Sequence, residues 1–460
     1  MTDFAALLQP DRGQPAHLLH ALRGDAFETW LGEQPERSRA AVAAALFRAR
    51  PGEFVILPGD KAGNWAAAIG LPDGAGPWDL AGAVAHLPEG DYRLADGDPG
   101  LAALGWLLAH HRFERYLRAP EPFPNRVLLT GEAARIDETV RLAEAVALVR
   151  DLVDTPAGDL GPAELAAAAE AVANAHDATF RVTQGDALAQ DYPMIAAVGR
   201  GATHARAPRL IEIEWGNPAH PRVAIVGKGV CFDSGGLDIK PAAGMLTMKK
   251  DMGGAAHVLA LAQLVMAAQL PVRLHMLIPA VENAVSADAF RPGDIVRSRK
   301  GVSVEIGNTD AEGRLILGDA LARACEDGPA LLLDFATLTG AARVALGPDL
   351  PALFASDDAV AEALLAAGAA VGDPLWRMPL WKPYRDLLES TVADINNAGT
   401  GGMAGAVTAA LFLQTFVPAD IPWAHVDTFA WRAAAKPGRP KGGEALGLRA
   451  AWEMLRMRFR

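Results

Sequence analysis

Residues 223–236 read VAIVGKGVCFDSGG, and this stretch decides the fold class of the chain. Its first four residues, Val223–Val226, form a short apolar run of the kind found in buried strands. The remainder is rich in glycine and carries Lys228 and Asp233. Ligands bind at the carboxyl ends of strands in open α/β sheets, so a strand followed by such a loop predicts a binding site at a sheet edge.

The same pattern extends outward in both directions from this stretch. Apolar runs that are typical of buried strands alternate with longer segments of helical length. Such alternation favours an α/β fold with a mainly parallel central sheet that is covered by helices on both faces. The expected strands are Leu210–Trp215, Val223–Val226, Val272–Ile278, Leu331–Phe335 and Trp423–Val426. The expected helices are Ala255–Ala268, Arg314–Cys325, Val360–Ala370 and Ala404–Phe416.

The chain has 460 residues, which allows two or three domains at roughly 150 residues each. In the first third, Glu53–Leu57 and Asn125–Leu129 resemble strands, and Leu101–Leu117 has helical spacing. A long helix is expected to follow, and DTPAG at 154–158 ends it because proline bars continuation of a helix. We therefore expect an N-terminal α/β domain of unclear function (1–135), a linker helix (136–155) and a larger C-terminal catalytic domain (156–460).

Charge and cysteine content disfavour several classes of protein. Acidic residues number 55 against 43 basic ones, and the formal net charge of −12 disfavours binding to nucleic-acid phosphates. The 2 cysteines are too few for a disulfide framework and fit a reducing compartment. The N-terminus does not resemble a secretory signal, and the longest apolar tract, residues 404–417, is too short to span a bilayer. We expect a cytoplasmic protein with neither a membrane nor a nucleic-acid partner.

Two further polar clusters share the character of the loop after Val226. Residues 249–254 read KKDMGG and residues 308–314 read NTDAEGR, and each opens an expected helix. Carboxylates in Gly-rich turns can approach a metal ion closely because the turn lacks bulky side chains. A pair of divalent ions, ~3.5 Å apart, can make a water nucleophilic near neutral pH. Four carboxylates can supply oxygen ligands to such a pair: Asp233, Asp251, Asp310 and Glu312.

These segments together resemble the signature of the cytosol (leucyl) aminopeptidase family. The octapeptide NTDAEGRL at 308–315 is the most specific part of the resemblance. The likeness runs in unbroken order from about Arg150 to about Arg449, roughly two thirds of the chain. The other matching segments are residues 226–236, 240–241, 251–256, 334–341, 379–381 and 423–427.

The resemblance implies a metal-dependent exopeptidase that releases N-terminal residues, often Leu, from peptides through attack by a metal-bridging water. It implies two divalent ions per chain, zinc or manganese. Asp233 and Glu312 would bridge the two ions. Asp310 would complete one site, while Lys228 and Asp251 would complete the other.

The same resemblance assigns the remaining functional residues. Lys240 would polarise the scissile carbonyl and stabilise the oxyanion, and Arg314 would hold a bicarbonate that shuttles protons. Met248, Asn308 and Thr337 fall where family members line the pocket for the first side chain. Peptide substrates and assembly into a homohexamer are also implied.

The chain departs from the usual family pattern close to these residues. Asp238 stands where Ser or Asn is commoner, two residues before Lys240. The pair Lys249-Lys250 is more basic than usual beside Asp251. None of these departures removes an expected metal ligand.

The residues alone leave three alternatives to a two-metal aminopeptidase. A two-metal phosphoesterase would use a similar site, but it usually enlists histidines, and none lies between Lys228 and Asp251. A DNA-binding protein that keeps an aminopeptidase fold is disfavoured by the net charge of −12. A metal-free α/β scaffold would need five ligand-type residues at the family spacing by accident.

Overall fold

The computed structural model describes residues 2–61 and 63–460. The chain forms two compact units: a smaller unit of Met1–Ala147 with Ala434–Lys441, and a larger unit of Leu148–Ala433 with Gly442–Arg460. The helix expected after residue 135 is α6 (Ile136–Asp154), and the border between the units lies inside it. No sequence pattern predicted that Ala434–Lys441 groups with the smaller unit.

A mixed sheet forms the centre of the smaller unit, in the strand order β1-β6-β5-β2-β4-β3. In the described part of this sheet the neighbours run parallel, apart from the antiparallel pair β3–β4. Its strands are β1 (Leu8–Pro10), β2 (His17–Leu22), β3 (Phe54–Pro58), β4 (Trp65–Gly70), β5 (Gly90–Leu94) and β6 (Arg126–Thr130). Its helices are α1 (Phe4–Leu7), α2 (Phe27–Glu33), α3 (Glu36–Ala44), α4 (Ala81–Val84) and α5 (Ala102–Leu108). The two strands expected in this region are confirmed as β3 and β6.

The helix expected over Leu101–Leu117 is much shorter in the structure. All residues of α5 are buried, and the helix ends at Leu108. The amides of His110 and His111 donate to carbonyls three residues earlier, at 3.0 and 3.2 Å, which tightens the last turn. The prediction was wrong for residues 109–117 because both histidines are buried in this tight turn, which helical spacing does not reveal.

Nine strands of the described chain form the central sheet of the larger unit. Their order is β16-β15-β18-β14-β9-β11-β8-β7, and β10 pairs with β11. The central pairs β18–β14, β14–β9 and β9–β11 are parallel, which confirms the expected mainly parallel sheet. The strands are β7 (Thr179–Gln184), β8 (Arg209–Trp215), β9 (Arg222–Gly227), β10 (Gly229–Asp233), β11 (Arg273–Asn283), β14 (Leu331–Ala336), β15 (Ala352–Ala355), β16 (Trp376–Arg377) and β18 (Trp423–Asp427).

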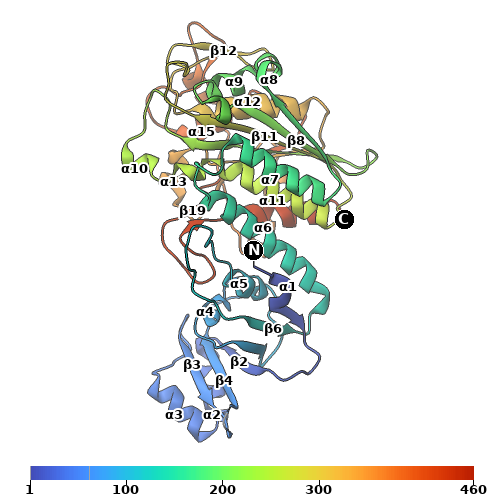
Figure 1. Ribbon diagram of the computed structural model, residues 1–460, viewed down its shortest axis with the longest axis vertical. Coiled ribbons are helices and arrows are strands. Elements are labelled where there is room, and N and C mark those ends of the chain that lie inside the picture. Colours follow the sequence, from blue (N-terminus) through green and yellow to red (C-terminus); the bar gives the residue numbers. More distant parts are fainter. Residues whose placement is uncertain (1, 62) are drawn as a thin grey trace. The chain divides into compact units, whose positions relative to one another are not determined.

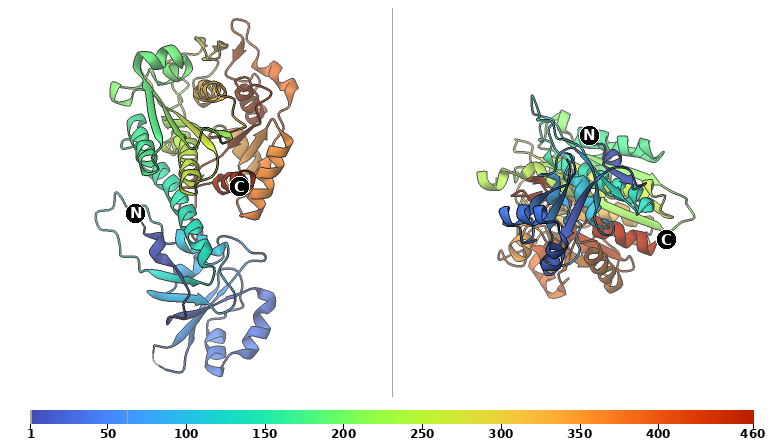
Figure 2. Two further views of the ribbon diagram at one scale, coloured as in Figure 1. Left: turned by 90° about the vertical axis from the view of Figure 1, so that its right-hand side faces the viewer. Right: turned by 90° about the horizontal axis from the view of Figure 1, so that it is seen from below.

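Helices cover both faces of this sheet, as expected (Figure 1). α7 and α11 lie on one face, whereas α9, α12 and α15 lie on the other, and a view turned by 90° agrees (Figure 2). No helix in the described ranges combines the length and apolarity that crossing a bilayer requires. The helices are α7 (Pro162–Ala175), α8 (Gly185–Asp191), α9 (Pro193–Gly199), α10 (Ala242–Met245), α11 (Gly253–Ala267), α12 (Glu312–Cys325), α13 (Gly340–Leu346), α14 (Asp358–Ala370), α15 (Gly405–Gln414) and α16 (Leu448–Arg458).

Two glycines allow α11 to approach the ends of β9 and β14 closely. A Cβ on Gly227 would lie 2.6 Å from the Gly254 carbonyl oxygen. A Cβ on Gly254 would lie 2.1 Å from the carbonyl oxygen of Phe335. Neither distance leaves room for a side chain, so only glycine fits both positions. The approach brings the start of α11 to the strand ends that carry Lys228 and Thr337.

Candidate metal and active site

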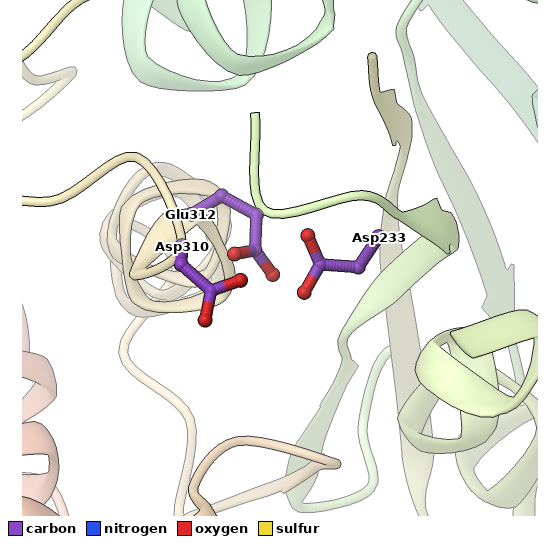
Figure 3. Close-up of side chains that lie close together, drawn as sticks. All are labelled: Asp233, Asp310 and Glu312. Atoms are coloured by element: carbon purple, nitrogen blue, oxygen red, sulfur yellow. The ribbon is translucent and has the colours of Figure 1, made fainter. Parts of the chain in front are cut away.

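A cavity of about 380 Å³ opens in the larger unit at the carboxyl ends of β9, β10 and β14. This is the edge of a parallel sheet where ligands usually bind, and the volume is typical of small-molecule sites. All expected site residues line it except Glu312, which lies beside Asp233 and Asp310 (Figure 3). The lining residues from the expected set are Lys228, Asp233, Lys240, Met248, Asp251, Asn308, Asp310, Arg314 and Thr337.

Lys228 lies between β9 and β10 and is almost completely buried, with 3% of its surface exposed. Its Nζ lies 2.6 Å from Asp251 Oδ2 and 3.0 Å from Glu312 Oε1, and it donates to the Thr337 carbonyl at 3.1 Å. Burial lowers the pKa of Lys228, but the charges of Asp251 and Glu312 outweigh it, so the pKa is raised above the ordinary value. Lys228 therefore forms ion pairs with two of the expected metal ligands, Asp251 and Glu312.

Asp233 ends β10, and its two carboxylate oxygens have different partners. Its Oδ1 accepts hydrogen bonds from Asn283 Nδ2 and the Gly235 amide, both at 2.9 Å. Its Oδ2 lies 2.8 Å from Lys240 Nζ, which also forms an ion pair with Asp310. Burial lowers the pKa of Lys240, but the effect of its carboxylate partners is larger, so the pKa is raised above its ordinary value.

Three carboxylates converge at the N-terminus of α12: Asp233, Asp310 and Glu312 (Figure 3). Each offers one oxygen that lies within 4.8 Å of the oxygens offered by the other two. Burial and the negative charge of Asp233 raise the pKa of Glu312 to about 8. Glu312 Oε2 is buried and has no hydrogen-bond partner among the described residues. The ion pairs with Lys228 and Lys240 therefore leave one carboxylate oxygen of the cluster unsatisfied.

Asp251 lies in the short 3-10 helix η4 (Met248–Met252), which leads into α11. Its Oδ1 accepts a hydrogen bond from Thr337 Oγ1 at 2.8 Å, and its Oδ2 faces Lys228. Burial raises the pKa of Asp251, but the charges of Lys228 and Lys250 outweigh it and lower the pKa to about 2. Asp251 therefore shares the ammonium group of Lys228 with Glu312.

Arg314 follows Glu312 in the first turn of α12 and is 9% exposed. Its Nη1 donates to the Asn397 carbonyl at 2.7 Å, and its Nε is buried without a hydrogen-bond partner in the part of the chain that the structure describes. Burial lowers the pKa of Arg314 to about 10. The guanidinium thus keeps an unused donor at the cavity wall, which suits the binding of a small anion.

The donor set fits divalent metal ions. Carboxylate oxygens suit hard cations, and a neutral amine adds a nitrogen ligand. The unpartnered Glu312 Oε2 shows that the existing contacts leave the cluster unsatisfied. The ammonium groups of Lys228 and Lys240 each lie between two carboxylates, which marks positions where this site favours a cation.

Four further residues contribute to the site, and sequence reasoning did not assign them roles. Asn283, at the end of β11, orients Asp233, and its only sequence signal is a polar residue that closes an apolar strand. Lys250 and Arg343 line the cavity. The side chains of both contact the ring of Phe429. Burial lowers the pKa of Lys250 to about 8.

Fold and site together define a metallohydrolase whose catalytic centre lies at the edge of a mainly parallel sheet. The chain belongs to the cytosol aminopeptidase family: the model of that family's catalytic domain matches residues 147–451. The model of the M17 aminopeptidase N-terminal domain matches residues 18–129. The match to the catalytic domain includes every expected site residue.

Individual relatives agree with this assignment. A protein of Roseiflexus castenholzii described as "Probable cytosol aminopeptidase" is 42% identical over 369 residues, which cover 76% of this chain and 75% of that protein. The crystal structure of the cytosol aminopeptidase from Coxiella burnetii has a TM-score of 0.94 at 45% identity and covers 99% of this chain and 100% of that chain. The bottromycin maturation enzyme BotP in complex with Mn has a TM-score of 0.86 at 34% identity, with coverage of 99% and 100%.

The family assignment confirms the resemblance that the motifs indicated. The protein is a metallopeptidase that acts on peptides from the amino end. The phosphoesterase, the non-enzymatic DNA-binding protein and the metal-free scaffold are thereby set aside. The roles of individual residues remain predictions.

Proposed function

We propose that this protein is an aminopeptidase that releases Leu-like residues from the N-terminus of peptides with the help of two divalent ions, zinc or manganese. The convergence of Asp233, Asp310 and Glu312 next to the buried Lys228 carries this proposal. Asp233 and Glu312 would hold both ions, and Asp310 would complete one site. Lys228 and Asp251 would complete the other site.

The bound ions would supply a nucleophilic water held between them and would polarise the scissile carbonyl. Lys240 lines the cavity beside Asp233 and Asp310, where its ammonium can donate to the carbonyl oxygen as negative charge develops on it. Arg314 would hold a bicarbonate through its unused Nε–H, and this anion would accept and return the proton of the water. No side chain of the cluster is then needed as general base.

The pocket for the first side chain is proposed between Met248, Asn308 and Thr337. All three line the cavity, and the buried Met248 offers the apolar surface that a Leu side chain requires. Thr337 lies directly beside the metal ligand Asp251 through its 2.8 Å hydrogen bond. A free amine bound at the ion that Asp251 ligates would place the first side chain against this wall.

Family resemblance also supports a homohexamer in the cytoplasm, without membrane or nucleic-acid partners. The relatives named cytosol aminopeptidases support the location, and the net charge of −12 supports the exclusion of nucleic acid. The assembly is tested by the mass of the purified protein in solution. Monomers at micromolar concentration would contradict the hexamer.

The activity is tested with Leu-amide and N-acetyl-Leu-amide. We expect hydrolysis of Leu-amide after loading with Mn²⁺ or Zn²⁺, and its loss after treatment with a chelator. The acetylated substrate should not be hydrolysed, because it lacks the free amine that one ion would bind. Equal rates on the two substrates would contradict an exopeptidase mechanism.

A further inference from the structure

Lys250 is a buried cation that the proposed mechanism does not use. Its side chain is 1% exposed and lines the cavity. An ammonium has three N–H donors, yet the hydrogen bond that Nζ donates, to Asp251 Oδ1, is long at 3.5 Å. Its other close contact is the ring of Phe429, whose centroid lies 5.4 Å from Nζ. A buried charge with so few partners is costly unless a ligand supplies them.

A second cation contacts the same aromatic ring. Arg343 projects from α13, and its Cζ lies 4.6 Å from the centroid of Phe429. In the described part of the chain its guanidinium has no carboxylate partner within ion-pair distance, although it lines the same cavity. Lys250 and Arg343 therefore bring two positive charges to the cavity, and both contact the ring of Phe429.

This pair lies on the wall that is proposed to receive the first side chain. Asp251 Oδ1 accepts hydrogen bonds from both Thr337 Oγ1 and Lys250 Nζ, so the two donors are neighbours. Lys249 is directed elsewhere: its Nζ donates to the Asp154 carbonyl and lies 5.7 Å from the Trp431 ring. Of the two adjacent lysines, only Lys250 is therefore available to the cavity.

We propose that Lys250 and Arg343 bind the side-chain carboxylate of an acidic first residue, so that the enzyme releases N-terminal Glu and Asp as well as Leu-like residues. This inference rests on the proposed aminopeptidase function and deepens it. The carboxylate would accept hydrogen bonds from both cations, while the Phe429 ring would contact the methylene groups. The pair would then determine specificity without touching the scissile bond.

The test compares Glu-amide with Gln-amide, because these substrates have the same shape and differ in one charge. We expect wild-type kcat/KM for Glu-amide to exceed that for Gln-amide by about tenfold or more, the size of a hydrogen bond between charged groups. Lys250→Met and Arg343→Met should each bring this ratio close to one. Lys249→Met removes the same charge from the neighbouring position and should keep the wild-type ratio.

Binding provides a readout that does not need turnover. Calorimetry on the metal-loaded protein should give a Kd for free L-glutamate about tenfold below that for L-glutamine, and Arg343→Met should remove the difference. If Leu-amide is not hydrolysed but this binding pattern holds, the proposed function fails while the anion site stands. If Leu-amide is hydrolysed but glutamate and glutamine bind alike, the anion site fails while the proposed function stands.

A third comparison distinguishes the two carboxylates of a peptide. Leu-Gly carries a terminal carboxylate that Leu-Gly-amide lacks, and we expect the variants to leave the ratio of their kcat/KM values unchanged. A change in this ratio together with an unchanged Glu to Gln ratio would overturn the assignment, because the cations would then bind the other end of the substrate. Arg343 is half-buried on the largely exposed helix α13, so its variant keeps the test valid even where Lys250→Met fails to fold.

Discussion

The assignment of Lys228 as a metal ligand gives the sharpest prediction, because a lysine coordinates only when it is neutral. Arg keeps the positive charge at this position but cannot be deprotonated in a protein and has no lone pair for a metal. We expect Lys228→Arg to bind about one ion per chain where the wild type is expected to bind two. Metal affinity at the wild-type site should also fall as pH falls, because binding must release the proton that Asp251 and Glu312 help to retain.

The effect of these substitutions on the free energy of unfolding follows from the surroundings of Lys228. Its Nζ balances Asp251 at 2.6 Å and Glu312 at 3.0 Å, so Lys228→Met removes the nearest cation from two buried carboxylates and leaves Asp251 only the 3.5 Å ion pair with Lys250. Breaking a buried pair in this way costs about 3–5 kcal/mol of the free energy of unfolding. Lys228→Arg keeps the charge but overfills the site, because a Cβ on Gly313 would already lie 2.5 Å from Lys228 Cε. Overpacking of this kind costs about 1–3 kcal/mol.

The assay measures metal content after dialysis, kcat on Leu-amide, and unfolding of the metal-free protein. We expect both variants to lose activity by at least about 10²-fold, a loss typical of removing one group that stabilises the transition state. The metal-free Met variant should be less stable than the Arg variant. Two ions per chain and near-normal rates in Lys228→Arg would refute the assignment, and Lys228 would then only neutralise its carboxylate neighbours.

Three further predictions concern other charged side chains. Lys240→Ala should lower kcat on Leu-amide by about 10²–10³-fold with unchanged metal content, and normal kcat would show that Lys240 does not stabilise the oxyanion. Arg314→Lys should abolish activation by added bicarbonate, because Lys cannot offer a bidentate fork, and retained activation would remove Arg314 from that role. Burial lowers the pKa of His425, but Asp334, 2.5 Å away, outweighs it and raises the pKa above 6.5. The ion pair between His425 and Asp334 should therefore stabilise the fold below about pH 6.5, and this stabilisation should be lost as the pH rises through the raised pKa. Thermal unfolding from about pH 6 to 9 should show a decline in Tm for the wild type that His425→Gln lacks.

Much of the fold could be predicted because the signals are local. The strands β8, β9, β14 and β18 and the helices α11 and α12 lie close to their expected bounds, since buried strands and helices impose apolar runs of recognisable length. The wrong prediction at residues 109–117 has a different cause: a tight turn buries two histidines after Leu108, and only tertiary packing reveals it. The strand β10 was also missed, because its glycine and Asp233 are typical of a turn.

The candidate site likewise contains residues that local motifs predict and residues that only the tertiary structure reveals. Lys228, Asp233, Asp310 and Glu312 could be proposed from contiguous motifs, and the position of those motifs after strands predicted that they would meet. The partner of Asp233 could not be predicted from the sequence, because Asn283 is 50 positions away and reaches Asp233 only through the pairing of β10 with β11. Residues that meet across a sheet leave no pattern in the sequence between them.

The pair Lys249-Lys250 shows most clearly what the sequence alone cannot predict. The sequence by itself determined that two lysines precede Asp251, the family to which the chain belongs, and the strand and helix pattern that surrounds them. Only the tertiary structure decided that Lys249 donates to the Asp154 carbonyl while Lys250 lies in the cavity against Phe429. The physical reason is that a 3-10 helix has three residues per turn, so successive side chains of η4 point about 120° apart, and the packing around that helix determines which of them reaches the site.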